Sequence, residues 1–368
     1  MDKRDTYLML KSVAKLSNKA IDDLNDSLQN LEDLYDLSDD EILNLEKLNL
    51  NIKKIIVKYR GRTYLDEVKE SLYRKSVKFL CCEDELYPQK LKNICDNPKV
   101  IFYKGNIENL NTGLNIAMVG SRKPTYYGVN TAKKIARDLS NSGVGIVSGL
   151  AIGIDAFSHI GCLEGASKTI AVLGSGVDDI LPRQNAKLAE RILDDGGLII
   201  SEFGVDSKVF PSNFSMRNRI ISGVSDGVLV VEAAGKSGAL ITVECALDQG
   251  RNVFAVPGNI TSNMSRGCNR MIKDGAKLCE DIDDILEEYG IKVQTDAHNS
   301  KNADLESLNL SDEEKIILST IDIRGSMHID DICDKTNIDI KTVNTVLNKL
   351  LLMDIVIEWK NKTYSLNK

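Results

Sequence analysis

The chain has 368 residues, of which 42% are hydrophobic and 27% charged, a composition typical of globular proteins with two or three domains. Its net charge of −7 excludes binding to nucleic acid through overall charge, so any such contact has to come from a local patch. Because no apolar run is long enough to span a bilayer and residues 1–11 lack the apolar core of a signal peptide, we expect a cytoplasmic protein without membrane contact.

The first part of the chain, residues 1–75, is predicted to form a small helical domain, since apolar residues such as Met9, Val13 and Leu16 repeat at helical spacing. Residues 1–50 carry 12 acidic and 6 basic side chains, whereas residues 51–79 carry 9 basic and 3 acidic ones. The basic run is interpreted as a solvated helix face, with a surface that follows a phosphate backbone as the alternative.

Residues 80–290 are predicted to form an α/β domain, because short β-branched runs alternate with helical patterns from about residue 112 onward. The expected strands are 116–120, 145–149, 169–174, 198–203, 227–231 and 252–256. Strands that alternate with helices indicate right-handed crossovers and a doubly wound, mostly parallel sheet.

The end of the chain is predicted to form a separate small domain. Residues 291–306 are polar and are interpreted as a linker. Within residues 307–368, Ser311 and Glu314 are spaced as a capping box at the start of a helix. Helices at 329–336 and 340–353, and strands at 355–359 and 363–366, complete the order of a winged helix-turn-helix.

The carboxyl ends of the expected strands carry the chemistry, because ligands bind at that edge of an open parallel sheet. Glycines there let the backbone approach a ligand, and free backbone N–H groups favour anions. We therefore predict a phosphate-binding rim, the alternative being that the glycines only close tight turns. The candidate residues are Gly120, Ser121, Arg122, Ser148, Gly149, Gly153, Gly174, Ser175, Lys236, Ser237, Gly238 and Thr242.

A second group of candidates lies in residues 210–219, which contain two aromatic rings, two arginines and no acid. Aromatic rings stack on bases and arginine binds phosphate, so this segment predicts contact with single-stranded nucleic acid. The alternative is that the rings belong to the core and the arginines pair with nearby acids. The candidates are Phe210, Phe214, Arg217, Asn218 and Arg219.

Motifs of nucleotide-dependent enzymes are incomplete. Gly235, Lys236 and Ser237 match the end of a phosphate-binding loop, but its first glycine position holds Val230. No dinucleotide-binding glycine fingerprint follows residue 120, and no nucleophile is spaced with a histidine for catalysis. The eight cysteines and three histidines lack metal-binding spacing. We therefore expect a binding protein that is not an enzyme and has no cofactor or metal.

The ordered motifs resemble the DNA-processing protein A family. They are Gly120–Arg122, Ser148–Asp155, Gly174–Gly176, Phe210–Pro211 with Arg217–Arg219, Ser237–Thr242 and Phe254–Gly258. The resemblance implies an extended Rossmann-like domain that binds and protects single-stranded DNA. It also implies a homodimer that helps to load the RecA recombinase, in DNA uptake during natural transformation or in general recombination.

The resemblance also implies roles for individual residues. Arg122, with Gly120 and Ser121, would hold a backbone phosphate; Arg217 and Arg219 would hold others. Phe210 or Phe214 would stack on a base. The N-terminal part corresponds to a SAM-like or helix-hairpin-helix-like domain, although residues 13–18 contain no glycine for such a hairpin.

Two other functions stay open. A Rossmann-like nucleotide phosphoribohydrolase would need a glutamate three residues after Thr242, but Glu244 follows it by two. A winged-helix transcription regulator could read bases with Thr342, Asn344, Thr345 and Asn348. Residues 305–368, however, carry 11 acidic and 8 basic side chains, a poor balance for binding DNA and one that makes a protein contact of this domain at least as plausible.

Overall fold

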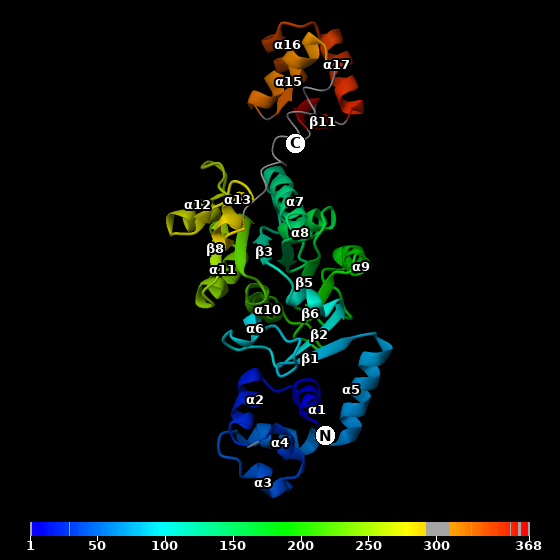
Figure 1. Ribbon diagram of the computed structural model, residues 1–368, viewed down its shortest axis with the longest axis vertical. Helices are drawn as coiled ribbons and strands as arrows, with labels where there is room; N and C mark the ends of the chain where they lie inside the picture. Colours follow the sequence, from blue (N-terminus) through cyan, green and yellow to red (C-terminus); the bar gives the residue numbers. More distant parts are fainter. Residues whose placement is uncertain are drawn as a thin grey trace. The chain divides into compact units, whose positions relative to one another are not determined.

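The computed structural model describes residues 2–28, 30–291, 310–324, 326–353, 355–359 and 362–366. The chain divides into two compact units, residues 1–293 and 294–368 (Figure 1). Residues 1–75, predicted as a domain of their own, belong to the same unit as the sheet. From residue 292 on, the linker predicted at 291–306 lies outside the described residues.

A nine-stranded sheet forms the centre of the first unit, in the order β1-β2-β6-β5-β4-β3-β7-β8-β9. The neighbours from β6 to β9 are parallel, which confirms the mostly parallel α/β sheet, whereas β1 pairs with β2 and β2 with β6 in antiparallel fashion. The strands are β1 (Lys78–Cys81), β2 (Val100–Gly105), β3 (Asn115–Gly120), β4 (Gly145–Ser148), β5 (Thr169–Leu173), β6 (Leu198–Ser201), β7 (Gly227–Glu232), β8 (Asn252–Ala255) and β9 (Lys277–Leu278).

Helices cover both faces of this sheet, so its central strands are buried on both sides and consist almost entirely of apolar residues. Ile116 and Met118 of β3 pack under α7 and α8, while the alternate residues Ala117 and Val119 belong to the core on the other face, with α10 and α11. None of the described helices combines the length and hydrophobicity that crossing a membrane requires. The helices around the sheet are α6 (Gln89–Lys92), η3 (Ile107–Leu110), α7 (Tyr126–Asn141), α8 (Ile154–Leu163), η4 (Arg183–Asn185), α9 (Ala186–Asp194), α10 (Pro211–Gly223), α11 (Ala239–Asp248), α12 (Arg266–Lys273), α13 (Asp283–Leu286) and η5 (Glu287–Tyr289).

The N-terminal helices pack against the β1–β2 side of the sheet. Their apolar residues, such as Leu8 and Leu24, share one continuous core with Phe102 of β2. Arg4 donates a hydrogen bond to the Phe79 carbonyl of β1 at 2.6 Å. These helices are α1 (Lys3–Leu8), η1 (Met9–Val13), α2 (Asn18–Asn25), η2 (Leu31–Tyr35), α3 (Asp39–Leu43), α4 (Leu50–Tyr59) and α5 (Arg62–Arg74).

The second unit has its own core, which includes Ile317, Ile332 and Leu347. The predicted capping box is present: the Ser311 N–H donates to the Glu314 carboxylate at 2.9 Å, and the Glu314 N–H donates to the Ser311 hydroxyl at 3.3 Å. The unit consists of α15 (Asp312–Arg324), β10 (Met327–His328), α16 (Ile329–Thr336), α17 (Ile340–Leu352), β11 (Val356–Trp359) and β12 (Thr363–Leu366), with sheet order β10-β12-β11.

Candidate nucleic-acid interface

The strand order reverses between β3 and β7, with β4 to β6 on one side and β8 and β9 on the other. Ligands of open α/β sheets bind beyond the carboxyl ends of the strands at such a switch point. Gly120 and Glu232 are paired at these two strand ends, and Arg122 and Lys236 follow them. Both side chains are exposed, and neither makes a hydrogen bond or ion pair with another residue of the described chain. The switch point thus carries two exposed cationic side chains that are available to a ligand.

Main-chain contacts fix the loop that carries Arg122. The Ser121 N–H donates to the Glu232 carbonyl at 2.7 Å, and the Ile154 N–H donates to the Ser121 carbonyl at 3.0 Å. Gly153 has a φ of +86°, and a Cβ at this position would lie 2.3 Å from the Ser121 carbonyl oxygen. No other residue fits there without moving the backbone. The predicted residues Gly120, Ser121 and Gly153 therefore act by holding Arg122 in place.

Arg217 is buried, with 4% of its surface exposed. Its guanidinium donates to the Gly149 carbonyl at 2.7 Å and to the Val172 carbonyl, so it bridges the ends of β4 and β5. The Gly149 N–H in turn donates to the Asp155 carboxylate at 3.1 Å. Burial lowers the pKa of Arg217 to about 10, with the positive charge of Arg122 adding to the effect and Asp155 opposing it. These contacts favour a structural role for Arg217 beneath the rim over direct contact with a phosphate.

The Asp155 carboxyl is the acidic partner in this buried cluster. Burial raises its pKa, while the positive charge of Arg217 and the N–H groups of Ala151 and Gly149 act in the opposite direction. The Arg217 Nε–H donates a hydrogen bond to the side-chain oxygen of Asn218 at 3.3 Å, so Asn218 belongs to the same cluster.

Arg219 also has protein partners. It donates to Glu202 at 2.6 Å and pairs with Asp96 at 3.1 Å. Glu202 accepts further bonds from Lys11 at 2.9 Å and Asn18 at 2.8 Å. Burial alone would raise the pKa of Glu202, but Lys11 and Arg219 hold it below its ordinary value. Arg219 therefore makes the contacts that the alternative interpretation of the sequence predicts, because it pairs with nearby acids.

The two aromatic candidates differ in exposure. Phe210 precedes the first turn of α10 and is 56% exposed. Phe214 is half-buried against the end of β5, where a Cβ on Gly174 would lie 2.9 Å from its ring. Phe210 therefore offers a ring face to a ligand, and Phe214 supports the rim from below. Lys208, exposed two residues before Phe210, was missed in the sequence, although a cation beside an aromatic residue is the signal to look for.

The other candidates complete the rim. The Ser148 hydroxyl donates to the Met118 carbonyl at 2.6 Å and the Ser175 hydroxyl to the Asp179 carbonyl at 2.6 Å, so both are buried structural groups. Thr242 is buried in α11. The Ser237 hydroxyl accepts from the Ala239 N–H at 3.3 Å. Gly238, just before α11, has open space around its Cα, which leaves the start of that helix accessible beside Lys236.

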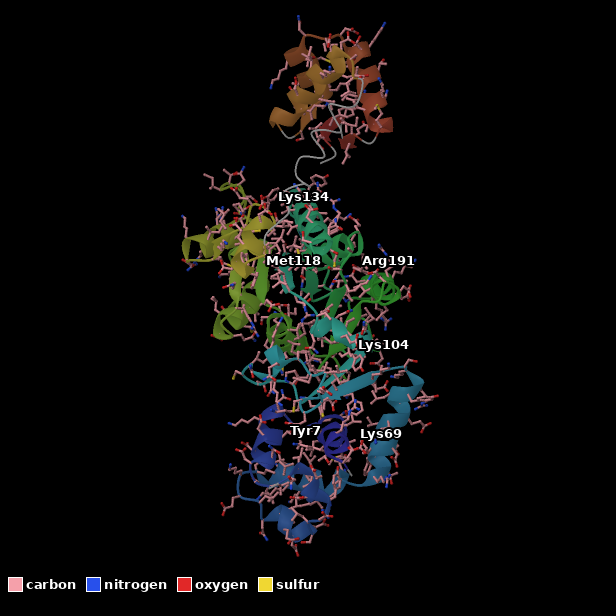
Figure 2. The ribbon with its side chains drawn as sticks, viewed as in Figure 1. Tyr7, Lys69, Lys104, Met118, Lys134 and Arg191 are labelled. Carbon is pink, nitrogen blue, oxygen red and sulfur yellow. The ribbon has the colours of Figure 1, made fainter. Side chains whose placement is uncertain are left out.

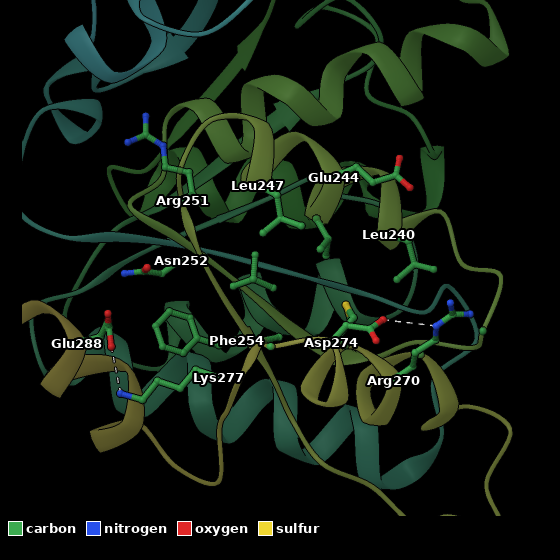
Figure 3. A pocket seen from close by; sticks show the side chains of 17 residues that line it. Leu240, Glu244, Leu247, Arg251, Asn252, Phe254, Arg270, Asp274, Lys277 and Glu288 are labelled. Atoms are coloured by element: carbon green, nitrogen blue, oxygen red, sulfur yellow. Dashed lines mark hydrogen bonds and ion pairs between the residues drawn. The ribbon is translucent and has the colours of Figure 1, made fainter.

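A groove of about 550 Å³ lies between α11 and α12, over β8 (Figure 3). Apolar side chains such as Leu240 and Leu247 line it, with an ion pair between Lys277 and Glu288 at 3.4 Å near its edge. Glu244 faces this groove, whereas Thr242 is buried on another side of α11. The acid that a phosphoribohydrolase would need is therefore absent from the Thr242 side of the helix.

The basic run at residues 51–79 is partly used within the protein. Arg60 pairs with Asp39, Lys69 (labelled in Figure 2) with Asp5 at 2.6 Å, and Lys75 with Asp178 at 2.6 Å. Arg62 and Arg74 are exposed. Three of the nine basic residues of this run therefore hold the N-terminal helices together and to the sheet-containing part of the unit.

The part of the chain that contains the sheet has known relatives. The family model for DNA recombination-mediator protein A matches residues 78–290. Protein Smf of Escherichia coli is 44% identical over 217 residues, which cover 58% of this chain and 58% of that protein. DNA processing protein DprA of Streptococcus pneumoniae is 43% identical over 206 residues, which cover 56% of this chain and 72% of that one. The match thus spans less than two thirds of the E. coli relative.

Two solved structures are similar as well. The X-ray structure of DprA from S. pneumoniae has a TM-score of 0.57 and 35% identity, and covers 74% of this chain and 98% of that one. A structure of DprA from Helicobacter pylori, whose title describes its single-stranded DNA binding mode, has a TM-score of 0.52 and 29% identity, and covers 58% of this chain and 95% of that one. The chain belongs to the DNA recombination-mediator protein A family.

Proposed function

We propose that this protein binds single-stranded DNA along the carboxyl edge of its sheet. The observation that carries the proposal is the pair of exposed cations at the switch point, Arg122 and Lys236, neither of which has a hydrogen bond or ion pair within the described residues. The H. pylori relative, whose structure title names single-stranded DNA binding, supports the same ligand.

Binding follows from three kinds of contact. The Arg122 guanidinium binds a phosphate through two parallel hydrogen bonds, and Lys236 binds a neighbouring phosphate as a point charge. Phe210 stacks on a base with its exposed ring, and every base offers a suitable face. None of these contacts reads base edges, so binding is largely independent of sequence and weakens with salt.

The buried candidates serve this site indirectly. Arg217 bridges the strand ends below the rim, and Arg219 fixes the opposite side of α10. Gly149, Gly174 and Phe214 shape the surface between them. The strand therefore contacts few side chains, while a larger set of residues positions them.

The family description, a DNA recombination mediator, supports a wider role. We infer that the protein protects single strands and assists loading of the RecA recombinase onto them, in DNA uptake or in general recombination, as a cytoplasmic homodimer. A strand-exchange assay with RecA and a light-scattering mass measurement test these two parts separately.

The experiment for the binding site is a fluorescence-polarisation titration with labelled single-stranded and duplex oligonucleotides at two salt concentrations. Arg122→Ala is expected to weaken single-strand binding for all sequences alike. The salt slope, that is, the slope of log affinity against log salt concentration, should become shallower by about one, the value for one lost phosphate contact. Arg191→Ala is the matched control, because Arg191 (labelled in Figure 2) is exposed near the end of α9, from which the chain enters β6 at the amino edge of the sheet.

If Arg122→Ala bound single strands as tightly as the wild type, the placement of the site would be wrong. Equal affinity of the wild type for single-stranded and duplex DNA would overturn the single-strand preference, and hydrolysis of nucleoside monophosphates would become the assay to run.

A further inference from the structure

The first turn of α7 lies at the switch point, where the free N–H groups of a helix start commonly bind a phosphate. Here a carboxylate of the protein itself occupies this position. One oxygen of Glu232, at the end of β7, accepts the Thr125 N–H at 2.7 Å. Its other oxygen accepts the Thr125 hydroxyl proton at 2.6 Å. Glu232 is 2% exposed.

The neighbouring residues make room for this carboxylate. A Cβ on Gly128, in the first turn of α7, would lie 2.5 Å from a Glu232 carboxylate oxygen. The Gly128 N–H is itself capped by the Thr125 hydroxyl at 3.2 Å. Glu232 has no ion pair with any residue of the described chain, so its charge rests on these donors and on the positive end of the helix.

We propose that Glu232 is a specificity-determining residue that closes the switch point to the phosphates of free nucleotides. A phosphate entering this position would have to displace a buried negative charge from two short hydrogen bonds. Phosphates can instead approach the outer side of the rim, where Arg122 and Lys236 are exposed. The protein would thus bind the outside of a continuous strand while excluding the mononucleotides that surround it in a cell.

This inference goes beyond single-strand binding and does not depend on it, because it concerns a ligand that is kept out. A purely structural cap would make the same contacts, but it would affect only the stability of α7. A charge that excludes anions makes a further prediction: neutralising it without changing its shape lets an anion bind.

The test uses the full-length chain and two probes, inorganic pyrophosphate and ADP, in calorimetric titrations. Glu232→Gln keeps the shape and one acceptor but removes the charge, and Glu232→Ala also empties the position. We expect both variants to bind pyrophosphate at least about tenfold more tightly than the wild type, as removal of one charge at short range implies. Glu190→Gln, on the exposed side of α9, changes net charge equally and is expected to match the wild type.

A readout with Glu232 in place keeps the inference testable even if neither Glu232 variant folds. Amide NMR signals of Thr125 and Gly128 are expected to stay unchanged when millimolar pyrophosphate is added to Arg122→Ala, which lacks the neighbouring phosphate contact. A shift of these signals in Arg122→Ala, or folded Glu232 variants that bind pyrophosphate no better than Glu190→Gln, would overturn the inference. Single-strand binding is measured in parallel by polarisation, so its loss would count against the proposed site and leave this inference untouched.

Discussion

At the scale of single residues, exposure separates Arg122, at the switch point, from Arg217, at the neighbouring ends of β4 and β5. Arg122 is exposed and has no hydrogen bond or ion pair in the part of the chain that the structure describes, whereas Arg217 is buried and bridges Gly149 and Val172. A buried charge that loses its partners costs far more than an exposed one. Substitution by alanine is therefore expected to lower the affinity for DNA at Arg122 and the stability of the fold at Arg217.

Arg217→Ala is expected to destabilise the protein by about 1.5–3 kcal/mol, because it leaves the buried carbonyls of Gly149 and Val172 without their charged donor. Chemical denaturation measures this loss. Adding Asp155→Asn to Arg217→Ala should recover part of it, since the two residues are coupled. A fully stable Arg217→Ala that had lost only DNA binding would instead identify Arg217 as a phosphate ligand.

Phe210→Ala is expected to weaken single-strand binding by about 1–3 kcal/mol while leaving the salt slope unchanged, since stacking involves no counterion release. The melting temperature should also be unchanged because Phe210 is largely exposed. Phe214→Ala is the informative comparison: it is expected to lower both affinity and stability, because its ring packs against Gly174. A change in the salt slope alone would mean that the rings only position the cations.

At the scale of elements, the Glu202 cluster joins η1, α2 and α10 to the end of β6. Lys11 and Asn18 come from the N-terminal helices and Arg219 from α10, and all three bond to one carboxylate. A single buried acid thus couples elements almost two hundred residues apart in the sequence.

Glu202 gives this junction a pH dependence. Because its pKa is lower in the folded protein than its ordinary value of 4.5, its contribution is fully present above that value and is lost as pH falls through the lower, folded pKa. Denaturant unfolding from pH 7 to pH 3 should therefore show a loss of stability in the wild type that sets in below about pH 4.5. Glu202→Gln should lack this component. An identical pH profile for both proteins would contradict this assignment.

The elements of the parallel sheet could be predicted from the sequence, because each central strand is buried on both faces and appears as a continuous apolar run. The antiparallel pair of β1 and β2 was not predicted. β1 is only Lys78–Cys81, adjoins a basic helix, and has one exposed end, so its pattern is too short to be distinctive.

The residue types of the site could be predicted from the sequence, but the directions in which their side chains project could not. Successive residues of a helix point about 100° apart, so Arg217 and Arg219 project to different sides of α10. Apolar residues of α10 do not concentrate on one face, so the sequence does not indicate which arginine is covered. Glu232 was missed for a similar reason: an acid at the end of an apolar strand gives no sign of which helix it caps.

At the scale of the whole molecule, the N-terminal helices and the sheet form one unit, while residues 294–368 form another. The rim lies entirely in the first unit. In the second, three of the four side chains that could read bases are used locally: the Thr342 hydroxyl donates to the Asp339 carboxylate at 2.6 Å, the Asn344 amide to the Ile340 carbonyl at 3.0 Å, and the Thr345 hydroxyl to the Lys341 carbonyl at 2.9 Å.

Two truncations should therefore behave differently. A chain ending at residue 293 is expected to keep the single-strand affinity and melting temperature of the full chain, because it retains the complete first unit. A chain lacking residues 1–75 is expected to aggregate, because it exposes the core that Leu8 and Leu24 share with Phe102. Gel filtration and polarisation distinguish the two. A monodisperse, active chain without residues 1–75 would show that these helices are an independent domain after all.

The loop that presents Arg122 is held by peptide groups: Ser121 bonds through its N–H to the end of β7 and through its carbonyl to the start of α8. Peptide groups are the same in every residue, so most side chains of this loop are free to vary while the arginine stays in place. Two glycines are exceptions: a Cβ on Gly153 would meet the Ser121 carbonyl, and one on Gly120 would lie 2.8 Å from the Glu232 carbonyl oxygen. Substitutions can therefore change the surface around Arg122 without changing the main-chain contacts that hold this residue in place.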